Sequence, residues 1–164
     1  MNPRRIGLVA AVALVVFGLD RITKAVVASS LPLGGSVDVI GPYVRITNVR
    51  NSGAAFGLLP ERTTLLSILS VVAVIAILFY YRQLAARSPF IAVTLGMQLG
   101  GAFGNLVDRL GQGYVVDFID IGLTPGPRFW AFNVADSSIV VGILLVVLAL
   151  WSEERSSARP TTAS

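Results

Sequence analysis

Four long apolar stretches constrain this chain more than any other feature of its sequence. They cover residues 6–33, where a charged group at 20–24 interrupts the run, and residues 63–81, 88–107 and 129–151. A helix that crosses a bilayer needs about 20 apolar residues. Charged residues make up 13% of the chain, whereas a soluble domain carries about a quarter. The sequence therefore predicts an all-α membrane protein with four transmembrane helices.

The two long connections between these stretches have the pattern of strands. Residues 43–50 alternate apolar and polar side chains, and residues 114–121 have a similar character before a turn at 125–127. If all four stretches span, both connections lie on one side of the membrane and both termini on the other. We expect a small β cap from residues 34–62 and 109–128, in one domain over 1–152, followed by a polar, disordered tail over 153–164.

The residue types that are missing exclude several kinds of chemistry. The chain has no Cys and no His, which excludes disulfides, thiol nucleophiles, imidazole bases and ordinary transition-metal sites. We therefore expect no metal and no cofactor. The net charge of +4 arises from basic residues scattered between apolar runs, which argues against a nucleic-acid partner.

Basic residues give the first indication of orientation. Arg4 and Arg5 directly precede the first apolar stretch, which favours a cytoplasmic N-terminus. A cleaved secretory signal over the first 28 residues is the alternative. The charged group at 20–24 argues against a cleaved signal, because these charges interrupt the apolar run just where a signal peptide would come close to its cleavage site.

Acidic residues gather at the cap end of the predicted helices. Charged side chains in or beside hydrocarbon cost a few kcal/mol each, so a cluster of them suggests a function. Two carboxyls in a poorly solvated pocket share a proton, which lets one act as acid and the other as base on a water molecule. The alternative for each acid is an ion pair or an interface, and spacing does not decide which two meet. The five are Asp20, Asp108, Asp117, Asp120 and Asp136.

Polar residues also recur at helical spacing beside these acids. Asn105, Asp108 and Arg109 share one helix face at offsets of three and four. They follow glycines at 96, 100 and 104, which favour close helix packing. Asn133 precedes Asp136 by three residues, and helix capping is its alternative role. Gly53 and Gly57 suit either a tight turn beside a ligand or an ordinary loop.

Taken together, five segments resemble the lipoprotein signal peptidase (signal peptidase II) family, the bacterial inner-membrane aspartyl peptidases. The segments occur in family order and cover most of the chain apart from the tail. Arg21 departs from the Gln often found after the first Asp, and Asp120 matches no motif. The segments are DRITK (20–24), NSGAAFG (51–57), GGAFGNLVDR (100–109), VVDF (115–118) and FNVADSSI (132–139).

The resemblance implies an activity and a division of roles. Asp117 and Asp136 correspond to the catalytic aspartates, which cleave the signal peptide from a prolipoprotein just before a diacylglyceryl-modified Cys. It also implies a multi-pass protein of the bacterial inner membrane, with cytoplasmic termini and the active site near the outer face, in contact with membrane lipids; we expect a monomer. The supporting or substrate-binding residues are Asp20, Lys24, Asn51, Gly53, Asn105, Asp108, Arg109 and Asn133.

Two other classes of protein compete with a peptidase. A small transporter or channel subunit would use intramembrane acids as a relay, but the middles of the second and fourth stretches are almost wholly apolar. A non-catalytic scaffold packed through the glycine seam leaves the acids and their polar neighbours unexplained.

Overall fold

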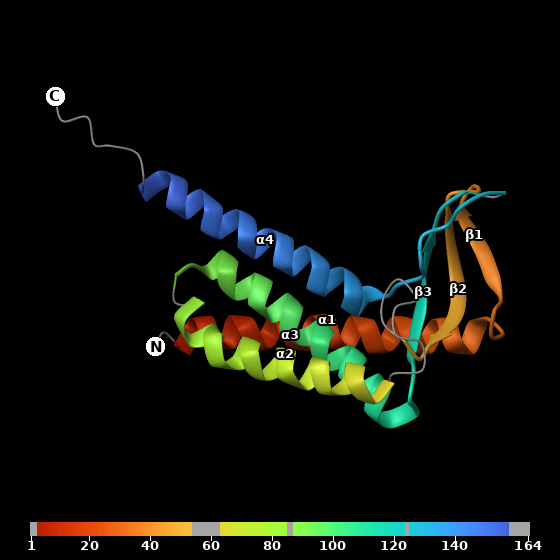
Figure 1. Cartoon of the computed structure of the whole chain (residues 1–164), viewed down its shortest axis with the longest axis horizontal. Coiled ribbons are helices and arrows are strands. Elements are labelled where there is room, and N and C mark those ends of the chain that lie inside the picture. The colour runs from red at the N-terminus through yellow and green to blue at the C-terminus, as the bar shows by residue number, and fades with distance from the viewer. Residues whose placement is uncertain (1–2, 54–62, 85–86, 124, 158–164) are drawn as a thin grey trace.

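The computed structural model of the chain describes residues 3–53, 63–84, 87–123 and 125–157. Its helices run roughly along one long axis, and the strands of the sheet run across that axis at one end of the helices (Figure 1). The helices are α1 (Pro3–Ser30), α2 (Thr63–Leu84), α3 (Pro89–Gln112) and α4 (Val134–Ser157), and the strands are β1 (Ser36–Ile40), β2 (Val44–Asn51) and β3 (Val115–Ile121).

Three of the described helices are long and apolar enough to cross a membrane. These are α1, α3 and the part of α4 from Val134 to Arg155, and α2 contains a shorter apolar segment over Thr64–Phe79. Large apolar side chains are exposed along α1, α2 and α4, as expected where lipid covers them. The chain is thus a multi-pass membrane protein, as its composition predicts.

The third helix is the centre of the bundle, because α1, α2 and α4 each pack against it. Its glycines allow backbones to approach closely. A Cβ built on Gly100 would lie 2.5 Å from the Ala13 carbonyl oxygen of α1, and one on Gly101 would lie 2.5 Å from the Ala135 carbonyl oxygen of α4. The predicted close packing of the glycines at 96, 100 and 104 is therefore confirmed against α1. Gly101, which was not part of that prediction, allows α4 to approach an adjacent face of α3.

A three-stranded antiparallel sheet in the order β1-β2-β3 forms the cap. In its register Val49 faces Asp117 and Asn51 faces Val115. The chain that leads into α4 joins the same sheet, because the amides of Phe118 and Ile119 both donate to the Phe132 carbonyl oxygen. The sheet thereby holds Asn51, Asp117 and the start of α4 together.

Three predicted boundaries were wrong. The fourth apolar stretch was expected to be helical from 129, but residues 129–133 are extended because Phe132 pairs with Ile119. The third helix continues past 109 and ends at Gln112, where it is capped by Gly113, whose φ of 79° suits glycine. The tail was expected to be disordered from 153, but α4 continues through Ser157. Residues 158–164 lie outside the described part of the chain.

Candidate active site

Asp117 occupies the middle of β3 and is almost completely buried, with 2% of its surface exposed. Two amides hold its carboxyl group. Asn51 Nδ2 donates to Oδ2 at 2.7 Å, and Asn133 Nδ2 donates to Oδ1 at 2.7 Å. Burial, with a further contribution from the charge of Asp136, raises the pKa of Asp117 to about 7, although the two amide bonds and Lys24 oppose this shift. A carboxyl group in this environment retains its proton close to neutral pH.

Asp136 lies in the first turn of α4 and forms a reciprocal cap with Asn133. The Asp136 amide donates to Asn133 Oδ1 at 2.9 Å, and the Asn133 amide donates to Asp136 Oδ2 at 3.2 Å. A third amide, Asn105 Nδ2, donates to Asp136 Oδ1 at 2.8 Å. Asn133 therefore caps the helix and also donates a hydrogen bond to Asp117.

Charged residues of α1 and α3 lie buried behind this pair of carboxyls. Lys24 Nζ donates to Asp20 Oδ2 at 2.7 Å and to Asn105 Oδ1 at 2.9 Å, and it forms an ion pair with Asp108 Oδ2 at 2.7 Å. Asp20 Oδ1 accepts the Ala135 amide at 3.0 Å, at the start of α4. These contacts join α1, α3 and α4 at the level of the site.

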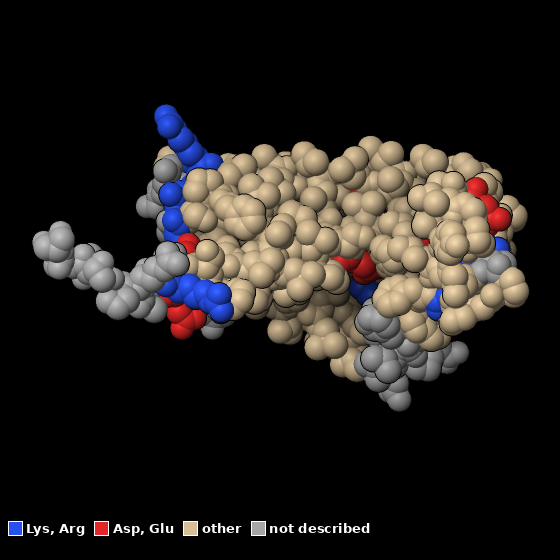
Figure 2. Space-filling model, turned by 90° about the horizontal axis from the view of Figure 1, so that it is seen from above, with Lys and Arg blue, Asp and Glu red and all other residues tan. Residues whose placement is uncertain are grey.

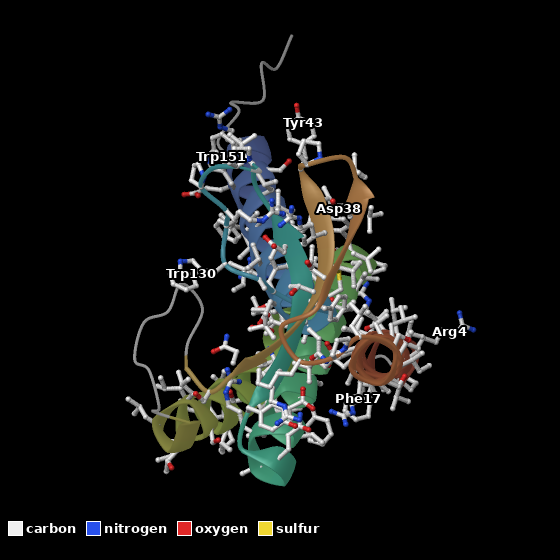
Figure 3. All side chains as sticks on the ribbon, turned by 90° about the vertical axis from the view of Figure 1, so that its right-hand side faces the viewer. Arg4, Phe17, Asp38, Tyr43, Trp130 and Trp151 are labelled. Carbon is white, nitrogen blue, oxygen red and sulfur yellow. The ribbon has the colours of Figure 1, made fainter. Side chains whose placement is uncertain are left out.

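Both carboxyls line one cavity of about 380 Å³. Its polar wall comes from Asn51, Arg109 and the two aspartates, and the remaining wall is mostly apolar. Figure 2 shows charged atoms at one point of a long face that is otherwise uncharged between the ends of the molecule. Trp130 projects from the loop before α4, on the side of the molecule away from α1 (Figure 3). The other lining residues are Val115, Phe129, Trp130, Ala131, Phe132, Ser137, Val140 and Val141.

The structure brings together most of the residues selected from the sequence. Asn51, Asp117 and Asp136 face the cavity with Arg109, whereas Asp20, Lys24, Asn105, Asp108 and Asn133 support them from behind. Gly53 donates its amide to Asn51 Oδ1 at 2.9 Å, which fixes the orientation of the Asn51 side chain. Residues 54–57 of the NSGAAFG segment lie outside the described residues.

One of the five acids does not join the site. Asp120 accepts from Arg128 Nε at 2.8 Å through both carboxylate oxygens, at the edge of the cap. The apolar lining was not selected from the sequence. Ser137 and Val140 could have been found from their positions one and four residues after Asp136, but no pattern distinguishes Phe129 or Trp130 from other aromatic residues.

Comparisons with known proteins agree with this arrangement. The family model described as signal peptidase (SPase) II matches residues 12–152. The chain is 39% identical over 144 residues to a lipoprotein signal peptidase of Halothermothrix orenii, covering 88% of this chain and 95% of that protein. It is 36% identical over 151 residues to one of Staphylococcus haemolyticus, covering 92% and 94%.

The fold is shared with solved structures. A bacterial membrane enzyme determined by the in meso method superposes with a TM-score of 0.86 at 34% identity, over 97% of this chain and 96% of that one. A second bacterial membrane enzyme gives a TM-score of 0.75 at 35% identity, over 88% and 93%. With the family model matching most of its length, the chain belongs to the signal peptidase II family.

Proposed function

We propose that this protein is a membrane aspartyl endopeptidase that removes the signal peptide from diacylglyceryl-modified prolipoproteins, cutting just before the lipidated Cys. The observation that carries the proposal is the pair of carboxyls, Asp117 and Asp136, that lines one cavity and shares Asn133 as a hydrogen-bond partner. The apolar wall of that cavity suits a substrate that lies in the bilayer. Family membership and the names of the relatives support the same substrate class.

In the proposed mechanism the two aspartates are catalytic and act without a covalent intermediate. Since the pKa of Asp117 is raised to about 7, the pair holds one proton near neutral pH. The ionised carboxylate takes a proton from water as the water oxygen attacks the scissile carbonyl carbon. The other carboxyl group gives its proton to the leaving amine as the C–N bond breaks. Asn51, Asn105 and Asn133 hold the carboxyls in position.

The remaining expected residues have supporting roles in this proposal. Arg109 faces the cavity with the carboxyls, and we assign it to substrate binding together with Asn51. Gly53 fixes Asn51, and Asp20, Lys24 and Asp108 hold the helices behind the site. These roles follow the contacts that each side chain makes.

We further propose that α2 is a fourth membrane span and that the protein is a monomer of the bacterial inner membrane. Both termini would be cytoplasmic and the cap and active site would lie at the outer face. Support comes from Arg4 and Arg5 in the first turn of α1 and from the basic residues that gather at that end of the molecule (Figure 2). Residues 1–152 would form the peptidase domain, and residues 153–164 a tail whose start extends α4.

The test is cleavage of a purified precursor by the purified protein in lipid. We expect release of the signal peptide from a diacylglyceryl-modified precursor and a new N-terminal lipidated Cys, identified by mass. An unmodified precursor with Ser in place of that Cys should stay intact. Asp120→Asn is the matched control, because Asp120 lies outside the cavity, and it should retain cleavage. Equal cleavage of both precursors, or a cut elsewhere, would contradict the proposed substrate.

A further inference from the structure

Arg21 is the residue at which the first motif departs from the family pattern, and it belongs to a buried cluster of charges. The side chains of Asp20, Lys24 and Asp108 are 0%, 3% and 1% exposed. Lys24 lies between the two acids, with Nζ 2.7 Å from an oxygen of each. Arg21 is 41% exposed and reaches inward to form an ion pair with Asp108 Oδ1.

Asn105 links the cluster to Asp136. Its Oδ1 accepts from Lys24 Nζ at 2.9 Å, and its Nδ2 donates to Asp136 Oδ1 at 2.8 Å. Because the ammonium group holds the carbonyl end of this amide, the NH₂ end points to Asp136. The position of Lys24 therefore determines how one catalytic carboxyl is held.

Arg21 balances the charge of the cluster. Two carboxylates face two cations when Arg21 is present, so the four side chains sum to zero. Without Arg21 the ammonium of Lys24 would stand against two buried acids, which leaves one uncompensated negative charge. A buried charge without a partner is costly. Lys24, already 2.7 Å from both acids, would be held more tightly by them and would bind Asn105 less well. The excess negative charge would also lie only one side chain away from Asp136.

We propose that Arg21 is a positioning residue of the peptidase, which neutralises Asp108 and thereby keeps Lys24 on Asn105 and Asn105 on Asp136. This role rests on the proposed function of Asp136. It assigns a role to the position where the sequence has Arg in place of the common Gln.

Steady-state cleavage by Arg21 variants, measured as a function of pH, tests this role. Arg21→Gln removes the charge and should lower kcat about tenfold, the change that corresponds to about 1.4 kcal/mol, with little change in KM. The acid limb of the pH profile should move to higher pH, because the excess negative charge favours protonation of the catalytic pair. Arg21→Lys restores the charge and should keep most of the activity.

A second substitution separates two possible roles of Arg21, which are balancing the charge of the cluster and merely holding α1 to α3 through its ion pair with Asp108. Asp108→Asn in the Arg21→Gln background returns the cluster to zero charge, and we expect it to recover most of the lost kcat and the original pH profile. Arg45→Gln is the matched control, because Arg45 pairs with Asp38 at 2.6 Å in the cap and lies outside the cluster. Other charges that act on Asp136 come from Arg109 on α3 and Asp117 on β3, and these variants leave both in place.

Two outcomes would overturn the role of Arg21. One is an Arg21→Gln enzyme with unchanged kcat and pH profile. The other is a double variant that is slower than Arg21→Gln, because anchoring without charge balance predicts additive losses. If Arg21→Gln fails to fold, recovery of folding and turnover in the double variant still supports charge balance, and its failure contradicts it. Absence of cleavage by the unsubstituted protein would instead refute the proposed function.

Discussion

Replacing Asp117 by Asn should abolish cleavage, and it should also make the free energy of unfolding less dependent on pH. The pKa of Asp117 is about 7 in the folded protein, against an ordinary value of 3.8. Between these values the folded state holds a proton that the unfolded state has lost, so stability falls as pH rises through this range and the fall ends above pH 7. Asn does not titrate and carries no such dependence.

The size of this effect follows from the same two values. From about pH 5 to pH 6 the unsubstituted protein loses about 1.4 kcal/mol for each pH unit because of Asp117, and the slope falls to about half that value at pH 7. The stability of Asp117→Asn relative to the unsubstituted protein should therefore increase by about 2 to 3 kcal/mol between pH 5 and pH 8. Any fixed cost from the altered bonds with Asn51 and Asn133 cancels, because it is the same at each pH.

Equilibrium unfolding in mixed micelles at pH 5, 6, 7 and 8 measures this difference. Tryptophan fluorescence provides the signal, since Trp130 lies in the loop before α4 and Trp151 lies within α4. Asp38→Asn is the control, because Asp38 is exposed on β1. A stability difference that stays constant from pH 5 to pH 8 would refute the inference that Asp117 is a buried acid with a raised pKa.

Three further substitutions test how the site is held. Gly101→Ala should lower the free energy of unfolding by about 1 to 3 kcal/mol and reduce cleavage, because its Cβ would meet the Ala135 carbonyl oxygen at 2.5 Å. Gly7→Ala should do neither, because Gly7 has open space around it. Equal behaviour of the two variants in thermal unfolding and cleavage assays would contradict a role for close packing at Gly101. Asn133→Ser keeps a capping oxygen but loses the amide that bonds Asp117. Its cleavage rate should therefore fall as far as that of Asn133→Ala, while its free energy of unfolding should be about 1 kcal/mol higher than that of Asn133→Ala. Equal stabilities of the two variants would argue against the cap. Lys24→Met should destabilise the fold by about 3 to 5 kcal/mol because it leaves the buried Asp20 without a cationic partner. Unfolding at an unchanged denaturant concentration would contradict this.

The sequence predicted the parts of the fold that depend on local patterns. Apolar length located the helices, alternation located β2 and β3, and glycines four residues apart located the face of α3 that contacts α1. The start of α4 was predicted too early because residues 129–133 are apolar like the helix itself. Their extended form depends on pairing between Phe132 and β3, a contact between segments that no local pattern contains.

The sequence likewise predicted the local features of the site but not its tertiary contacts. Helical spacing placed Asn105 with Asp108, and Asn133 with Asp136, but it did not show that Asn133 bridges the two aspartates. That bridge requires β3 and the start of α4 to meet, which is a tertiary contact. Selection of Asp117 and Asp136 from five acids came from the family resemblance. The structure adds a physical difference, because Asp120 is paired with Arg128 at the edge of the cap.

The kinetics of three variants test most directly whether Asp117 and Asp136 act as one catalytic unit. The measurement is kcat/KM for cleavage of the lipidated precursor by Asp117→Asn, Asp136→Asn and the double variant, each shown to be folded in lipid. We expect each single variant to lose at least about a thousandfold and the double variant to be no slower, because groups that act together give non-additive losses. Substantial cleavage by either single variant, or losses that multiply in the double variant, would contradict the account.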